Sequence, residues 1–195
     1  AYEISACLVG SEMCIRDRAR SPWLLLLHGD ATLPPGWADA VGRAIARPTA
    51  SARAYYFELA IDGRHPGLRL VERAVALRSR WRQLPYGDQG LLLPAVLLEQ
   101  CGGIHPLPLM EDLDLVNRLR HRARLRSLRL PLQVDGRRWR QLGVWRTALV
   151  NARLRRAWRR GAAPQALAEA YYGRQGAYQK AQRRCKGSSS QPWDS

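Results

Sequence analysis

Acidic side chains directly follow an apolar segment near the start of the chain, in a pattern that could bind a metal ion. The stretch WLLLLHGDATLPPGW, residues 23–37, runs five apolar residues straight into His28 and Asp30. An ionised carboxylate beside a dry strand costs several kcal/mol unless a cation or hydrogen-bond donors accompany it. Mg²⁺ or Mn²⁺ prefers oxygen ligands and bridges to substrate phosphates, which makes this a candidate metal motif. Capping of the turn before LPPG explains Asp30 equally well.

A second acid lies in a helical pattern and is suited to removing a proton. In EDLDLVNRLR, Asp112 shares a helical face with Leu115, Val116 and Leu119, whereas Glu111 belongs to another face. Favourable interaction with the helix dipole explains an acid in a first turn without any catalytic role. Because Asp112 points inward with the apolar stripe, we expect it to face a cavity. There it could accept the proton of an attacking hydroxyl group.

A third polar motif lies between these two. In RQLPYGDQGLLL, Asp88 and Gln89 immediately precede an apolar run, and the flanking Gly87 and Gly90 let the backbone turn sharply and approach a ligand. A plain turn is the alternative for this motif taken alone.

The elements that must position these residues alternate between strands and helices. Strands are expected over residues 23–27 and about 53–61, in GLLLP and in LRSLRLPLQV. Helices are expected over about residues 37–47, in PGLRLVERAVALRSRW, in AVLLEQCGG and in EDLDLVNRLRHR. This alternation predicts an α/β fold with a mostly parallel sheet. In such sheets ligands bind beyond the carboxyl ends of the strands, where His28 and Asp30 lie.

The joint order of several motifs is similar to that of a known enzyme family. LLLLHGDATLPPG, YGDQGLLL, LPLMEDLDLVNRLR and RRWRQLGVWRTALVN follow one another as in family 2 glycosyltransferases of GT-A fold. They resemble in particular a small bacterial branch associated with radical-SAM and arsenosugar genes. The resemblance covers about residues 23–172. It implies a Rossmann-like catalytic domain that moves a sugar from a nucleotide-sugar donor to an acceptor hydroxyl.

The resemblance also implies roles for individual residues. The D-x-D metal motif of the family falls on HGD, so that Asp30 would hold Mg²⁺ or Mn²⁺, with His28 in place of the first acid. Asp112 would be the base of an inverting displacement. The remaining implied substrate contacts are Asp88, Gln89, Glu111, Arg138 and Trp139. The last two faintly resemble the Q-x-x-R-W motif of processive synthases, with Asp135 in place of the glutamine.

The same comparison suggests how the chain is organised. The string CLVGSEMCIRDR resembles translated adapter sequence, and residues 1–19 are expected to be a non-native leader that forms no element. Residues 20–135 would be a truncated catalytic domain that lacks the first nucleoside-binding strands, so that this is an incomplete transferase. Residues 136–178 would form a helical extension, and residues 179–195 a disordered tail.

The charge of the chain leaves two further interpretations open. There are 32 Lys and Arg against 16 Asp and Glu, and 30 of the basic residues are arginine, which points to a GC-rich genome for most of them. From Arg138 to Arg160, a helical pattern places Leu142, Trp145 and Leu149 on one face, which suits peripheral membrane contact or packing on the sheet. The alternative function is a basic nucleic-acid-binding module, although no recognised motif supports it.

The location expected from the sequence is the cytoplasm, at most peripheral at the inner face of the membrane. The four cysteines form no C-x-x-C pair, which argues against a zinc site or a disulfide framework. No apolar segment reaches the roughly 18 residues that a spanning helix needs.

Overall fold

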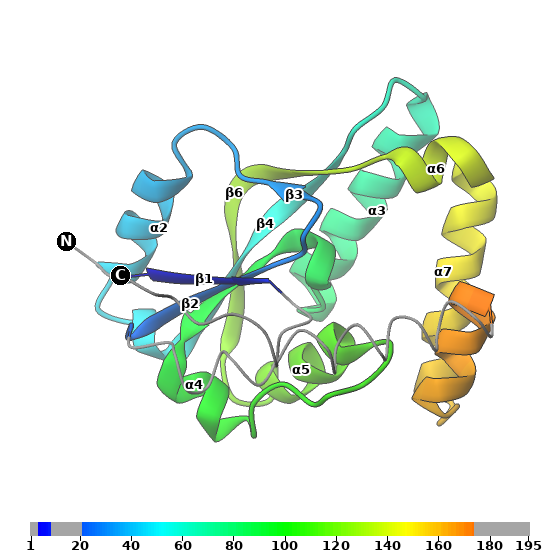
Figure 1. Ribbon diagram of the computed structural model, residues 1–195. Helices are drawn as coiled ribbons and strands as arrows, with labels where there is room; N and C mark the ends of the chain where they lie inside the picture. The colour runs from blue at the N-terminus through cyan, green and yellow to red at the C-terminus, as the bar shows by residue number, and fades with distance from the viewer. Residues whose placement is uncertain (1–3, 9–20, 174–195) are drawn as a thin grey trace, which may run out of the picture.

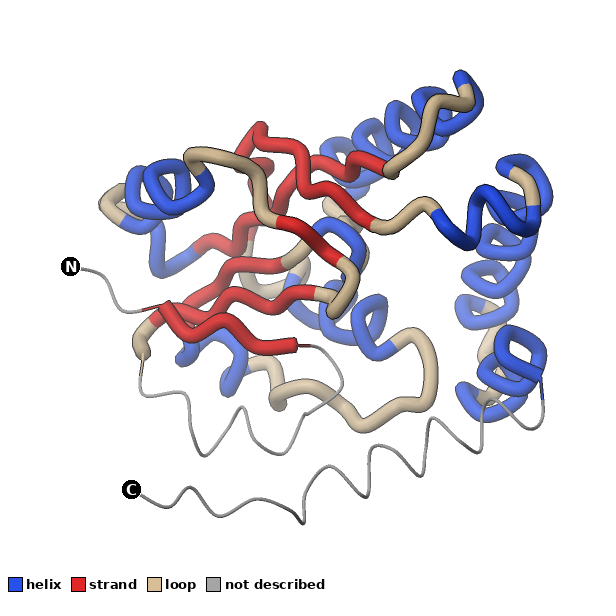
Figure 2. Tube along the Cα trace, turned by 45° about the horizontal axis from the view of Figure 1, so that its top comes forward, coloured by secondary structure: helices blue, strands red, loops and turns tan. Residues whose placement is uncertain are grey.

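The chain folds into a central sheet with helices on both faces. The computed structural model describes residues 4–8 and 21–173, and Figures 1 and 2 show its strands side by side between the helices. The strands are β1 (Ile4–Leu8), β2 (Trp23–Leu27), β3 (Ala31–Thr32), β4 (Arg53–Ile61), β5 (Leu91–Pro94) and β6 (Arg124–Val134). The helices are α2 (Trp37–Ile45), α3 (Pro66–Arg82), α4 (Ala95–Gln100), α5 (Glu111–Leu119), α6 (Arg137–Leu142) and α7 (Val144–Arg159). Short 3₁₀ turns, η1 (Ala50–Ala52) and η2 (Gly87–Gln89), precede β4 and β5, and residues 164–173 are helical.

The sheet is mixed, with the order β1-β2-β5-β4-β6-β3. β1, β2, β4 and β6 run in one direction, whereas β5 lies antiparallel between β2 and β4, and β3 lies antiparallel beside β6. The predicted α/β class is therefore confirmed, but a mostly parallel arrangement is wrong at the centre of the sheet. A short run of leucines buried on both faces is compatible with either strand direction.

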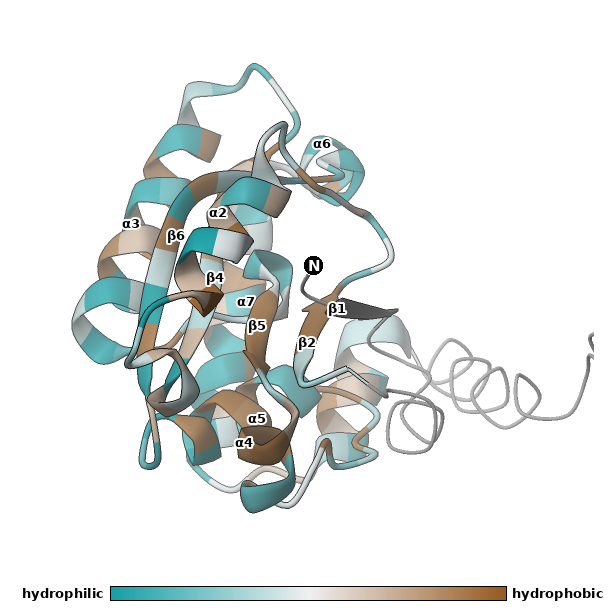
Figure 3. Cartoon of the chain, turned by 90° about the vertical axis from the view of Figure 1, so that its left-hand side faces the viewer, coloured by the Kyte–Doolittle hydropathy of each residue, from teal (hydrophilic) through white to brown (hydrophobic). Residues whose placement is uncertain are grey.

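Alternation along β2 and β5 separates two hydrophobic layers. Leu24 and Leu26 pack with residues of α4 and α5, whereas Leu25 and Leu27 pack with residues of α2. This is the two-residue period of a strand buried on both faces. Figure 3 shows β2 and β5 as hydrophobic strands, with hydrophobic segments of α4 and α5 lying beneath them. The site residue that follows β2, His28, continues the alternation on the α5 side.

A third layer lies at the far end of β4 and β6. Leu59 and Ile61 of β4 pack with Val134 of β6, with residues of α3 and with Val144 at the start of α7. α7 contacts α3, and Figure 1 shows the two helices neighbouring each other at one side of the molecule. Through this layer, α6 and α7 lie beside the edge of the sheet where β2, β4 and β6 end.

Most predicted boundaries are confirmed, and the differences lie near the two ends of the chain. Residues 53–61 are a strand as predicted. The expectation that residues 1–19 form no element is wrong at Ile4–Leu8, which pairs with β2. The single helix expected from Arg138 to Arg160 is two helices, because the backbone at Gly143 is in a left-handed conformation with φ of 81°. The predicted tail, residues 179–195, lies outside the described residues. Among residues 4–8 and 21–173, no helix combines the length and the apolar character needed to cross a membrane.

Candidate active site at the carboxyl edge of the sheet

The reversed direction of β5 brings two of the predicted motifs together. Leu91, at the start of β5, pairs with Leu26, near the end of β2, so the η2 turn lies beside the residues that follow β2. The contact between them is close: a Cβ atom added to Gly87 would lie 2.2 Å from Nε2 of His28. Only glycine allows the imidazole and this backbone to approach each other in this way. Had β5 been parallel, its start would lie at the opposite edge of the sheet.

Asp112 joins this pair from α5. The backbone N–H of Gly87 donates a hydrogen bond of 2.7 Å to Oδ2 of Asp112, and the N–H of Leu113 donates one of 2.8 Å to Oδ1. The α5 residues predicted to share its face, Leu115, Val116 and Leu119, are buried, which confirms the inward direction of that face. Each carboxylate oxygen keeps a second lone pair. The Asp112 carboxylate is therefore oriented by backbone donors while it can still accept a proton.

Asp88 lies in the same cluster and is unusually situated. Its Oδ1 atom is buried and has no hydrogen-bond partner among the described residues, and the same holds for Nε2 of His28. Burial raises the pKa of the Asp88 carboxyl, the positive charge of Arg78 lowers it, and the nearby Asp112 raises it further. A buried, unsatisfied carboxyl beside a second carboxylate is typical of acid and base pairs in active sites.

Two arginines supply positive charge to the cluster. The guanidinium carbon of Arg78, on α3, lies 3.6 Å from the ring centroid of Tyr86, and that of Arg155, on α7, lies 5.5 Å from it. Both guanidinium groups act electrostatically on the Asp88 carboxyl. Burial lowers the pKa of Arg78, and Tyr86 and Asp88 oppose this effect. Sequence reasoning missed both residues, because nothing in their local sequence separates them from the many other arginines.

The C-terminal helices contribute a further contact between an arginine and an aromatic ring. The guanidinium carbon of Arg138 lies 3.7 Å from the ring centroid of Tyr171, and its Nε atom is buried without a hydrogen-bond partner among the described residues. Burial raises the pKa of Tyr171, Arg138 lowers it, and Asp88 and Asp112 are among the groups that raise it. The substrate-binding role of Arg138 stays a prediction, and Tyr171 is a neighbour that the sequence did not indicate.

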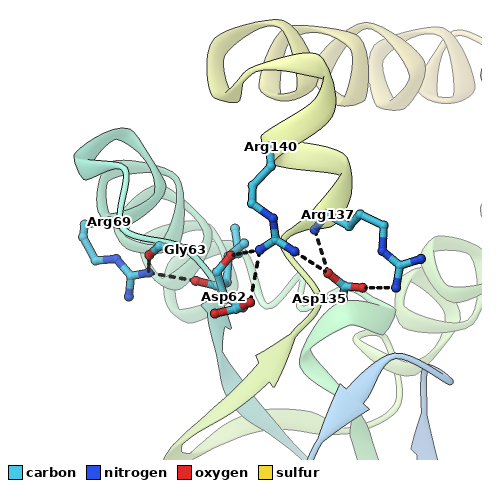
Figure 4. Close-up of polar contacts among 7 residues, drawn as sticks. Asp62, Gly63, Arg69, Asp135, Arg137 and Arg140 are labelled. Atoms are coloured by element: carbon cyan, nitrogen blue, oxygen red, sulfur yellow. Dashed lines mark hydrogen bonds and ion pairs between the residues drawn. The ribbon is translucent and has the colours of Figure 1, made fainter.

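An ion-pair network anchors the helix that carries Arg138. Figure 4 shows Arg140 and Arg137 of α6 around the residues that follow β4 and β6. Arg140 donates to the Asp62 carboxylate at 3.1 Å and to the Asp135 carboxylate at 3.4 Å. Arg137 donates to Asp135 through both its backbone N–H, at 2.7 Å, and its side chain, at 2.8 Å. Asp135 therefore pairs with arginines of α6, and its backbone bond to Arg137 is the main cause that lowers its pKa.

Other predicted residues occupy different surroundings. Gln89 is fully buried: its Oε1 accepts from Ser79 Oγ at 2.8 Å, and its Nε2 donates to the carbonyl of Phe57 at 3.1 Å. It holds the η2 turn against β4, so its side chain is engaged within the protein instead of facing a ligand. Trp139 packs against the third hydrophobic layer. Glu111, expected on another face of α5 than Asp112, is buried, and its substrate-binding role stays a prediction.

A pocket opens beside the Gly87–Asp112 bond. Its lining includes Leu26, Tyr86, Gly87, Glu111, Asp112 and Val116. The free space in this pocket is about that of one water molecule, and its accessible lining is apolar.

The metal ligands expected from the sequence do not come together as a group. Asp30 is exposed in the turn between β2 and β3 and makes no hydrogen bond or ion pair with the described residues, whereas His28 is half-buried. Within residues 4–8 and 21–173, no set of three His, Cys, Asp or Glu side chains is arranged to hold a metal ion. The residues present therefore do not form a preorganised cation site, and metal dependence stays a prediction.

Comparisons of the chain with protein-family models, with curated proteins and with solved structures find no match.

Proposed function

We propose that this chain carries the acceptor-activating part of a glycosyltransferase of GT-A fold. The observation that supports it is the joint position of His28, Asp88 and Asp112 around Gly87, at the edge where three strands of the sheet end. Ligands of open α/β sheets bind beyond this edge. The class of reaction is inferred from the order of the sequence motifs, which resembles that of family 2 glycosyltransferases.

In the proposed reaction, Asp112 accepts the proton of the acceptor hydroxyl. The acceptor oxygen then forms a bond to the anomeric carbon of the donor sugar, while the bond from that carbon to the diphosphate oxygen breaks. The electron pair leaves with the diphosphate, and the configuration of the sugar inverts. The positive charges of Arg78 and Arg155 would stabilise the charge that develops on this leaving group. Mg²⁺ or Mn²⁺ would supply further positive charge at the diphosphate.

The arginine-rich α7 helix favours a role for a membrane surface in presenting the acceptor. Of the predicted apolar face, Leu142 ends α6 and is 41% exposed, whereas Trp145 and Leu149 lie one turn apart on α7 and are 61% and 51% exposed. The residues of α7 that are buried are instead Val144, Thr147 and Leu154, so packing of the apolar face on the sheet is wrong. An exposed apolar stripe on a basic helix is typical of interfacial binding.

The decisive test compares Asp112→Asn with Asp39→Asn, an equal change at an exposed position of α2. The protein is incubated with a panel of nucleotide sugars and hydroxyl acceptors, with and without Mn²⁺, and release of nucleoside diphosphate is measured. We expect Asp112→Asn to lower turnover by at least about 100-fold with donor binding retained. Asp39→Asn should turn over normally. Normal turnover by Asp112→Asn, or a loss of equal size in Asp39→Asn, would contradict the proposal.

A further inference from the structure

Five arginines line one hollow on the α2 side of the sheet. Arg43 lies in the last turn of α2 and Arg47 follows that helix, Arg53 begins β4, and Arg126 and Arg129 come from β6. Among the residues that the structure describes, no acidic side chain lines this hollow. Arg53 is the first residue of β4, so the hollow lies at the edge of the sheet opposite to that of Asp88 and Asp112.

The charge of these five arginines is uncompensated. None of their guanidinium groups makes a hydrogen bond or an ion pair with another described residue. Elsewhere Arg69, Arg80, Arg118, Arg137 and Arg140 each pair with a carboxylate. Glu58, which accepts a hydrogen bond of 3.1 Å from the lining residue Ser127, also accepts one of 2.5 Å from Arg80. Like charges gathered without counter-charges repel each other, and a bound anion would relieve that repulsion.

The framework under the arginines is rigid. The hydroxyl of Tyr55, on β4, donates a hydrogen bond of 3.1 Å to the carbonyl of Ala44, on α2, and so ties the two elements together. The pairing of β4 with β6 shifts between Tyr56 and Glu58, which gives β6 extra residues at this point. Arg129 lies in this irregular stretch with a left-handed φ of 58°. Bulges of this kind redirect side chains, here that of Arg129.

The chemistry of the hollow indicates phosphate recognition. Guanidinium groups bind phosphate oxygens in a bidentate manner, and five of them exceed what one phosphate group needs. Tyr55, the aromatic residue in the lining, is 3% exposed and its hydroxyl is engaged, so it offers no face for stacking a base. We infer that this hollow binds a ligand with two or more linked or adjacent phosphate groups, recognised through the phosphates alone. The inference is independent of the proposed transfer reaction.

The test uses inorganic tripolyphosphate, orthophosphate and vesicles containing cardiolipin as probes. The variant is Arg43→Gln/Arg126→Gln. The matched control is Arg73→Gln/Arg82→Gln, which removes the same charge from exposed positions of α3 outside the hollow. Binding is measured by calorimetry and by vesicle co-sedimentation, and far-UV circular dichroism checks that both variants are folded.

We expect the hollow variant to weaken tripolyphosphate binding at least about tenfold and the control less than about twofold. Loss of vesicle binding in the hollow variant alone would identify a lipid headgroup as the source of the phosphates, whereas tripolyphosphate binding without vesicle binding would identify a soluble ligand. If both variants lose the same amount of tripolyphosphate affinity, binding depends only on net charge, and the inference is overturned. Binding of orthophosphate as tight as that of tripolyphosphate, or no binding of tripolyphosphate, would also overturn it.

Discussion

The backbone N–H of Gly87 and the carboxylate of Asp112 are joined by a hydrogen bond of 2.7 Å that links the turn before β5 to the start of α5. The same glycine is in contact with the imidazole of His28. One backbone position therefore orients the proposed base and fixes its distance from the histidine that follows β2. Changes at Gly87 should act on the site through these two neighbours.

Gly87→Ala should displace His28. The new Cβ would lie 2.2 Å from His28 Nε2 and 3.1 Å from Asp112 Cβ. We expect a loss of about 1–3 kcal/mol in the free energy of unfolding, as for other overpacked positions. His28→Ala removes the clashing ring, so the double variant should regain most of this loss. Urea denaturation of the two single variants and the double variant gives the coupling energy.

The matched control for this experiment is Gly42→Ala in α2. A Cβ there meets nothing within 4 Å. Alanine in a helix should raise the free energy of unfolding by about 0.5–1 kcal/mol. Strictly additive effects of Gly87→Ala and His28→Ala would show that the two residues do not press on each other.

Asp88→Asn should stabilise the protein increasingly as pH rises. Burial raises the pKa of the Asp88 carboxyl above its ordinary value of 3.8, so the folded state holds this proton more tightly than the unfolded state. The stability linked to that proton is fully present below the ordinary pKa and is lost as pH rises through the raised pKa. Asparagine does not titrate, so the variant keeps its stability over this range.

The measurement is the free energy of unfolding of both proteins from about pH 4 to about pH 8. The difference in favour of Asp88→Asn should grow with pH and level off above the folded pKa. A difference that stays constant with pH, or that shrinks, would show that the carboxyl is not held in its neutral form.

Gly136→Ala should loosen α6 from the sheet. A Cβ at this position would lie 1.7 Å from the carbonyl oxygen of Asp62, which is backbone and cannot rotate away. We expect a loss of at least about 1–3 kcal/mol in the free energy of unfolding by urea denaturation. Arg140→Gln, which removes only exposed ion pairs, should cost less than about 1 kcal/mol. A Gly136→Ala protein as stable as the unchanged one would contradict the close approach of the two segments.

Trp145→Ser/Leu149→Ser should weaken binding to anionic vesicles if α7 lies on a membrane surface. Both side chains are more than half exposed. Leu70→Ser/Leu77→Ser is the matched control, because these α3 leucines are each 53% exposed and lie outside the basic helix. We expect at least about a tenfold loss of co-sedimentation for the α7 pair, given about 1.5–3 kcal/mol for burying each large apolar side chain. Equal behaviour of the two pairs would remove α7 as the contact.

The elements were predictable because their signals are local. The inward face of α5 follows from helical periodicity, and Asp112 was placed correctly for that reason. The limits of β4 follow from an aromatic, alternating segment. Direction is not local: the antiparallel course of β5 depends on β2 and β4, which lie far away in the sequence. The close approach of Asp88 and His28 therefore could not be predicted from their motifs.

The site was predictable only in part, for a related reason. Asp30 follows a buried strand, as His28 does, yet it is exposed because β3 leaves the turn to pair with the end of β6. Arg78 and Arg155 reach Asp88 from two different helices, through tertiary contacts that leave no trace in their own segments. Trp139 lies next to Arg138 in the chain, but its apolar ring packs against the third layer.

The central place of β5 also bears on how the chain is made. On the ribosome, β2 and β4 are complete before β5 emerges, and until then neither has the partner that separates them in the finished sheet. A leucine-rich strand with an open hydrogen-bonding edge is prone to pair with other chains. Between the synthesis of Ile61 and that of Pro94, β2 and β4 therefore each lack the partner strand that β5 provides in the finished sheet.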